Sequence, residues 1–259
     1  MARSASAPAS LLASSASSTS IAPATTSRHS ALVRATHWIT ALCFFALLVT
    51  GIEVLISHPR FYWGETGNVL TKPLFQIPIP ASRSLVPTGY GYTLPDQNGW
   101  SRYLHFQAAW ILVLTGLLYA IYGFVNGHFR KNLLPSKSDL SRPNFSATVV
   151  KHLRFERPSA AEAHSYNLLQ RLTYLFVIFV LFPFVVWTGL AMSPAFVSAF
   201  PSTVTILDGQ QSARTLHFFV TVALVAFLLV HVGMVFLAGF GSRMKAMITG
   251  RTATDSERI

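Results

Sequence analysis

The sequence predicts an all-α membrane protein, a bundle of four transmembrane helices with the N- and C-termini in the cytoplasm. Three observations support this fold class. Hydrophobic residues make up 51% of the 259 residues and charged residues only 11%, a balance far from that of a soluble domain. Four apolar stretches each have the length of about 20 residues that a helix needs to cross a bilayer. Finally, the connections between them alternate between rich and poor in basic residues.

The four predicted spans lie at about residues 35–56, 103–126, 170–193 and 214–239. A helix pairs its own backbone groups, so each stretch can cross the hydrocarbon without leaving them unsatisfied. We interpret residues 28–252 as one membrane domain. Residues 1–27 are mostly Ser, Ala, Thr and Pro, which is typical of a disordered tail. Residues 253–259 are expected to form a second tail.

The distribution of basic residues sets the orientation of the bundle. Residues 1–36, 127–166 and 240–259 contain three, seven and four Lys and Arg residues, fourteen together, whereas 58–101 and 194–213 together contain three, all of them in 58–101. By the positive-inside rule, the first three segments are cytoplasmic and the other two face outside. The formal charge of +11 therefore reflects membrane topology, and the expected surroundings are lipid rather than nucleic acid. We predict a multi-pass membrane protein.

Four histidines lie within the predicted spans, where an ionisable side chain is costly and usually functional. His37 opens the first span near the cytoplasmic surface, whereas His105 and His217 open the second and fourth spans near the outer surface. His231 follows His217 by fourteen residues, which is about 21 Å along a helix and brings it to the cytoplasmic level. The same spacing is about 40° short of whole turns, so both rings project from nearly one face.

Two facing imidazoles at one level are what a six-coordinate haem iron needs, and the interior of a bundle can hold the macrocycle. We therefore predict an inner b-type haem between His37 and His231, and an outer one between His105 and His217. A zinc site would instead require three or four ligands that converge on one point. Any one of these histidines taken alone could be an interhelical hydrogen-bonding group.

Two arginines and four glycines fit the same interpretation. Arg34 and Arg214 each lie three residues before a predicted ligand, where a guanidinium could pair with haem propionates. The alternative is that both side chains simply snorkel to the membrane surface. A glycine lets either a flat ring or a neighbouring helix come close to the backbone. Four glycines that lie within the spans are Gly51, Gly116, Gly189 and Gly233.

Several motifs in about residues 28–252 resemble one known family. They are Arg34–Trp38, Tyr103–Phe106, Gly127–Arg130, Leu133–Pro135, Tyr166–Arg171, and Ser212–Phe218 with His231. The chain resembles the four-helix, two-haem b-type cytochrome subunits of nickel–iron hydrogenases, formate dehydrogenases and thiosulfate reductases. It is most similar to the thiosulfate-reductase-type cytochrome b branch of that family.

The resemblance implies a subunit of a respiratory chain that passes electrons between the quinone pool and a partner oxidoreductase. The partner is expected to be periplasmic, to carry a molybdenum cofactor, and to dock on 58–101 and 194–213. In the formate dehydrogenase relatives, an Asn in a Tyr-Asn-x-x-Gln segment contacts the quinone. This implies a quinone contact for Asn167 and Gln170. The alternative for Asn167 is a helix cap at the start of the third span.

Two other functional classes stay open at this point. The bundle could be a stand-alone b-type cytochrome that oxidises a small reductant at the outer haem without a partner protein. It could also be a transporter in which the membrane histidines form a proton relay. The transporter hypothesis predicts a colourless protein, whereas both cytochrome hypotheses predict haem.

Overall fold

The computed structural model describes residues 30–68, 70–78, 95–135 and 168–250. Four helical spans within these residues are long and apolar enough to cross a membrane: Ala31–Ser57, Trp100–Val125, Leu168–Ala191 and Gln210–Leu237. They confirm the predicted all-α, four-helix membrane fold. The predicted tails, 1–27 and 253–259, lie outside the described residues.

The first, second and fourth spans are single helices, α1 (Ala31–Ser57), α3 (Pro95–Val125) and α10 (Gln210–Leu237). Ser30 caps α1, because its hydroxyl accepts a hydrogen bond from the backbone N–H of Val33 at 3.3 Å; Ser is favoured at this position. Shortly after α10 ends, Gly239 adopts φ of +93°, a conformation that glycine reaches without strain. This turn starts α11 (Phe240–Thr249), a short helix that the sequence analysis did not predict.

The third span consists of α6 (Leu168–Phe176), the π-helical turn η2 (Val177–Leu181) and α7 (Phe182–Ala191). Pro183 lies in the first turn of α7 and has no backbone N–H to donate to the preceding turn. The π-helical turn η2 provides a different backbone hydrogen bond next to Pro183, in which the N–H of Phe182 donates to the carbonyl of Val177. The irregularity in this span therefore lies next to Pro183 and has an identifiable cause.

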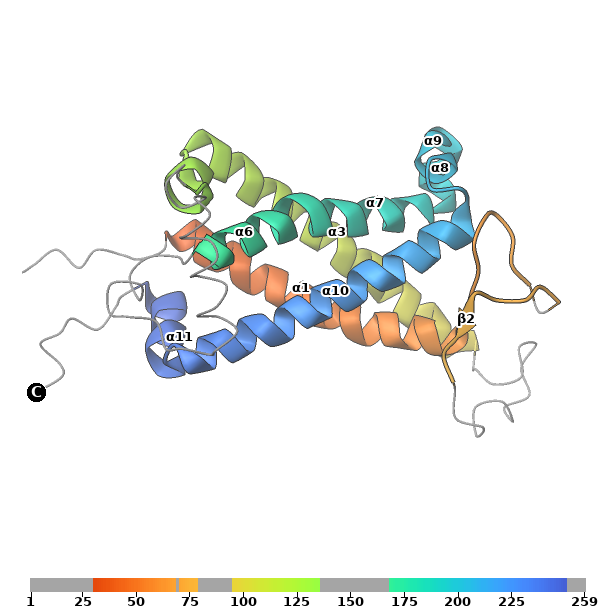
Figure 1. Cartoon of the computed structure of the whole chain (residues 1–259), viewed down its shortest axis with the longest axis horizontal. Helices are drawn as coiled ribbons and strands as arrows, with labels where there is room; N and C mark the ends of the chain where they lie inside the picture. The colour runs from red at the N-terminus through yellow and green to blue at the C-terminus, as the bar shows by residue number, and fades with distance from the viewer. Residues whose placement is uncertain (1–29, 69, 79–94, 136–167, 251–259) are drawn as a thin grey trace, which may run out of the picture.

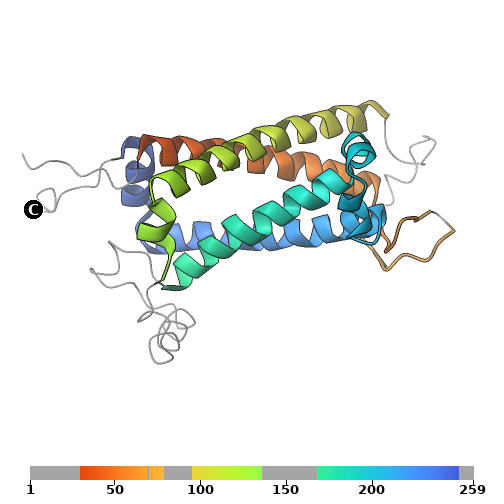
Figure 2. The same ribbon diagram turned by 90° about the horizontal axis from the view of Figure 1, so that it is seen from above.

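The helices form two closely packed pairs. α1 packs along α3, and α7 packs along α10. Figure 2 shows α1 and α3 together along one side of the bundle, with α10 along the other. Among the described residues, close backbone contacts between the two pairs are sparse. Side chains that point between the pairs are therefore those that can hold something between them.

The two ends of the bundle carry different short elements (Figure 1). One end has the π-helical η1 (Phe129–Leu133) and α11. The other end has α8 (Pro194–Ala199), α9 (Ser202–Thr205), and a hairpin of β1 (Arg60–Phe61) and β2 (Phe75–Gln76). The two strands are antiparallel, with Phe61 opposite Phe75. By the positive-inside assignment, the first end is the inner one and the second is the outer one.

Candidate functional site

The four membrane histidines face one another as two pairs. His37 on α1 and His231 on α10 have ring centres 6.3 Å apart, with 48° between the ring planes. His105 on α3 and His217 on α10 have ring centres 6.4 Å apart, with 59° between the planes. Each pair joins one helix of the α1–α3 pair to α10 of the other. The structure thus brings together the same residues that depth matching along the sequence had paired.

The spacing of each pair fits a metal bound between two imidazoles. Each metal–nitrogen bond would be about 2 Å long and each ring nitrogen lies about 1 Å from its ring centre, so bis-imidazole ligation separates the centres by roughly 6 Å. The observed separations of 6.3 and 6.4 Å agree with this value. Within the described residues, no group of three or more His, Cys, Asp or Glu side chains converges on one point. The donor set is therefore two separate histidine pairs.

Both imidazoles of the outer pair are held by a threonine from a neighbouring helix. The Thr50 hydroxyl of α1 lies 2.9 Å from Nδ1 of His105, and the Thr188 hydroxyl of α7 lies 2.9 Å from Nδ1 of His217. The sequence analysis missed both threonines. A signal was present, since each one precedes a glycine within a span, as Thr50-Gly51 and Thr188-Gly189.

Those two glycines lie against the outer histidines. A Cβ placed on Gly51 would be 3.6 Å from Cε1 of His105, and one on Gly189 would be 3.5 Å from Cε1 of His217. Gly116 and Gly233 have no such neighbour, because a Cβ on either would meet nothing within 4 Å. The close approach expected of the span glycines is therefore found at the outer pair.

Replacing Gly189 with leucine is expected to displace the His217 ring and lower the haem content. The alanine variant should be tolerated, because its Cβ would make an ordinary contact of 3.5 Å, whereas the longer side chain would overlap the ring. The matched control is Gly233→Leu, because Gly233 of α10 has open space where a side chain would begin. Haem per chain is the measurement. Equal haem content in Gly189→Leu and Gly233→Leu would contradict this prediction.

An apolar layer separates the two histidine levels along α10. Val220 and Leu224 are buried between His217 and His231 and pack with Val177 and Leu181 of η2. Phe227, one turn before His231, stacks on that imidazole with ring centres 5.7 Å apart. Between the two histidine levels, the packed face of α10 is therefore apolar.

The inner pair has a different environment from the outer pair. The ring of Trp38 lies edge-on to His37 at 5.4 Å, and the ring of Tyr174 lies 6.3 Å from His231. Nδ1 of His37 is buried and has no hydrogen-bond partner within the described part of the chain. Aromatic packing, rather than a threonine hydroxyl, therefore surrounds the inner imidazoles.

The two arginines predicted to contact propionates bond to backbone carbonyls. Nη1 of Arg34 donates to the carbonyl of Ile248 in α11 at 2.6 Å, and Nη2 of Arg214 donates to the carbonyl of Arg60 in β1. In each arginine, Nε is buried without a partner among the described residues. Each side chain thus links its span to a neighbouring element and keeps one N–H unpaired. Their contact with propionates stays a prediction.

The two residues implied in quinone binding lie at the start of the third span. Asn167 is outside the described residues, so the structure provides no geometry for it. Gln170 is on α6, four residues before Tyr174. Since residues four apart share one face of a helix, Gln170 lies on the face of α6 whose Tyr174 contacts His231.

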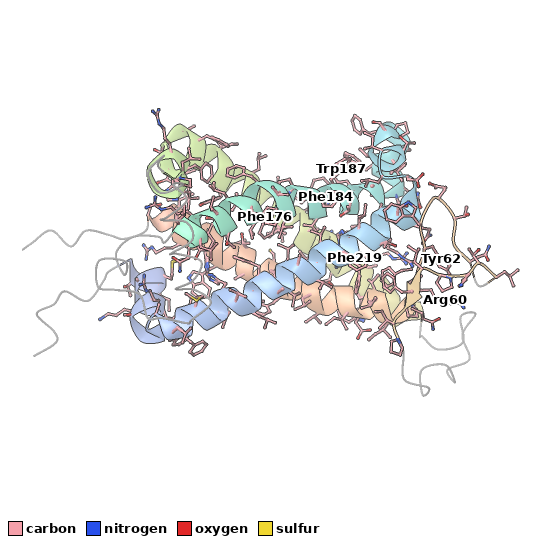
Figure 3. All side chains as sticks on the ribbon, in the orientation of Figure 1. Arg60, Tyr62, Phe176, Phe184, Trp187 and Phe219 are labelled. Carbon is pink, nitrogen blue, oxygen red and sulfur yellow. The ribbon has the colours of Figure 1, made fainter. Side chains whose placement is uncertain are left out.

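The hairpin at the outer end is fixed to the start of α10. The buried hydroxyl of Thr215 donates to the carbonyl of Tyr62 at 2.7 Å, and the N–H of Gly64 donates to the hydroxyl of Ser212 at 2.7 Å. Phe61 stacks on Phe75 and also contacts Phe218, which follows His217 in the sequence. Figure 3 shows Arg60 and Tyr62 of this segment at the outer end of the bundle, beside the start of α10. The hairpin is thus tied to the helix that carries the outer site.

Charge at this end is moderated by burial. Burial, followed by the positive charge of Arg214, lowers the pKa of His58, which lies just after α1. The lowered pKa favours the uncharged ring of His58.

A four-helix membrane bundle with two facing histidine pairs defines the class of membrane-bound b-type cytochromes. Comparison with protein families agrees: the model described as "Prokaryotic cytochrome b561" matches residues 28–250. The chain therefore belongs to the prokaryotic cytochrome b561 family, and it is a multi-pass bacterial membrane protein that carries b-type haem.

A curated relative has a related description. The chain is 29% identical over 214 residues to the "Putative protein-methionine-sulfoxide reductase subunit YedZ1" of Azospira oryzae, a match that covers 81% of this chain and 90% of the relative. No solved structure matches the chain.

Proposed function

We propose that this protein is a di-haem cytochrome b subunit that passes electrons between the quinone pool of the bacterial inner membrane and a periplasmic oxidoreductase. The observation that carries the proposal is the pair of ring separations, 6.3 Å at the inner level and 6.4 Å at the outer level. Two redox centres stacked across the membrane provide a route for electrons from one face to the other. A single haem site would lie near one face of the membrane and would not connect the two faces.

In this proposal His37 and His231 hold the inner haem iron, and His105 and His217 hold the outer one. Bound haem supplies one-electron redox chemistry, which protein side chains lack. The protein would hold the iron with these imidazoles and surround them with apolar side chains, and both factors would set the haem potential. Arg34 and Arg214 each have a buried Nε–H without a partner among residues 30–68, 70–78, 95–135 and 168–250, and a propionate carboxylate would satisfy it.

The quinone is assigned to the inner end. Gln170 and Tyr174 share a face of α6, and Tyr174 contacts the ring of His231. A quinone near Gln170 and Asn167 would therefore be close to the inner haem. Quinol oxidation there would deliver electrons to the inner haem first and then to the outer one.

The partner is assigned to the outer end, on the hairpin and the segment of α8 and α9. Trp63 and Leu74 of the hairpin, and Ile206 after α9, are exposed large apolar side chains at this end, as is typical of interaction surfaces. The curated relative is described as a subunit of a protein-methionine-sulfoxide reductase. That description favours an oxidoreductase as partner. A periplasmic location and a molybdenum cofactor for this partner stay predictions from the family resemblance, as does the thiosulfate-reductase-type branch.

Anaerobic reduction by quinol tests the proposed function. A short-chain quinol is added to the oxidised, detergent-purified protein, and the absorption bands of reduced b-type haem are followed with time. We expect both haems to be reduced without any partner present. A stand-alone cytochrome would accept electrons from a small outer reductant but not from quinol, and a transporter would have no haem absorption at all.

A further inference from the structure

The threonine contacts define the protonation of the outer imidazoles. The Thr50 hydroxyl donates its single hydrogen to the carbonyl of Ala46 at 2.7 Å, so towards Nδ1 of His105, at 2.9 Å, it can only accept. Nδ1 of His105 must then carry the proton. This leaves Nε2 as the nitrogen with a free lone pair, which is the form that binds a metal.

The same arrangement occurs on the other side of the outer pair. The Thr188 hydroxyl lies 3.0 Å from the carbonyl of Phe184, to which it donates, and 2.9 Å from Nδ1 of His217. Both threonines are fully buried, with an exposed fraction of 0%, so water does not compete for these bonds. Two imidazoles on two different helices are therefore fixed in the same tautomer by two threonines on the other two spans.

The inner pair provides the contrast within one chain. Nδ1 of His37 is buried and has no hydrogen-bond partner in the described residues. A ligand whose Nδ1–H is bonded to an acceptor is more basic and donates more electron density to the metal. This favours the oxidised iron, so the hydrogen bond lowers the reduction potential.

We propose that Thr50 and Thr188 are positioning residues that fix the tautomer of the outer axial histidines and lower the reduction potential of the outer haem. The proposal rests on the haem pairing put forward above. It gives the chain a way to set the outer potential independently of the inner one, since no hydroxyl of the described residues bonds to Nδ1 of His37. Electron transfer to the partner would then depend on two side chains that touch neither haem iron nor partner.

The test is a spectroelectrochemical titration of the purified full-length protein. Thr50→Val and Thr188→Val remove the hydroxyl while keeping the shape of the side chain, and Thr50→Ser keeps the hydroxyl. The matched control is Thr221→Val, because the Thr221 hydroxyl bonds to the backbone carbonyl of His217 at 2.8 Å and not to its ring. Variants that lack one histidine pair assign each potential to the inner or outer haem.

We expect a higher outer potential in each valine variant and a larger rise in the double variant. The inner potential should not change in any of them, and Thr50→Ser and Thr221→Val should match the wild-type protein. The electron paramagnetic resonance signal of the oxidised outer haem should also shift in the valine variants only, because its ligand rings are no longer held.

Two results would overturn the proposal while leaving the proposed function intact. One is two haems with unchanged potentials in both valine variants, and the other is an equal rise in Thr50→Ser. If Thr50→Val loses the outer haem, Thr50→Ser decides: retention with the wild-type potential supports the role of the hydroxyl, and loss contradicts it. Absence of haem from the wild-type protein would instead contradict the proposed function itself.

Discussion

Replacing His217 with alanine is expected to remove the outer haem and leave the inner one spectrally unchanged. The residue is one of two imidazoles whose ring centres are 6.4 Å apart, and six-coordinate iron requires both ligands. His105→Ala should have the same effect. Haem per chain, measured as the pyridine haemochrome, should fall by half in either variant, and the lost spectral component should be the same in both.

The inner ligands provide the complementary result. His37→Ala and His231→Ala should each remove the other spectral component, since their rings face one another at 6.3 Å. His58→Ala is the control, because His58 lies just outside α1 and belongs to neither pair. Loss of the same component in both His37→Ala and His217→Ala would contradict the pairing.

The second large effect is expected for electron flow in His231→Ala. Without the inner haem, quinol should no longer reduce the outer haem, because the haem that accepts electrons from quinol is missing. Dithionite, a small reductant that reaches haem directly, should still reduce the outer haem fully. The measurement is the anaerobic rate of haem reduction by quinol. In His231→Ala this rate should fall to the background rate that is recorded without added quinol.

The matched experiment uses His217→Ala. In this variant the inner haem remains, so quinol should still reduce it at the wild-type rate. Normal quinol reduction of the outer haem in His231→Ala would show that the quinone acts at the outer end, and it would refute the proposed order of electron transfer.

The spans and the histidine pairing could be predicted from the sequence because both depend on properties of one helix at a time. Hydropathy marks the four spans, and the fourteen-residue spacing of His217 and His231 fixes their relative depth and direction on α10. Orientation from basic residues then places His37 and His105 at the two levels. The observed ring contacts agree with this pairing.

The Thr-Gly pattern marks Thr50 and Thr188 in the sequence, but their contacts with His105 and His217 depend on how two helices are rotated against each other. The sequence alone gives no crossing angle or rotation for α1 against α3, or for α7 against α10. The hairpin was missed for another reason. Its strands are only two residues long, too short for alternation of apolar and polar residues to be recognised.

The arginines illustrate a third limit of pattern reasoning. Arg34 and Arg214 lie one turn before a histidine, which favours a role beside the haem. In the structure they also bond to the carbonyls of Ile248 and Arg60, groups more than one hundred residues away in sequence. Those carbonyls belong to α11 and to the hairpin, elements that the hydropathy pattern does not predict.

The most direct test of the central claim is the number of haems per chain in the purified wild-type protein. A reduced-minus-oxidised visible spectrum identifies b-type haem, and the pyridine haemochrome assay with the protein concentration gives the stoichiometry. The two histidine pairs predict two b-type haems per chain. One haem per chain after expression with ample haem supply would contradict the two-level electron route, and none would favour the proton-relay transporter.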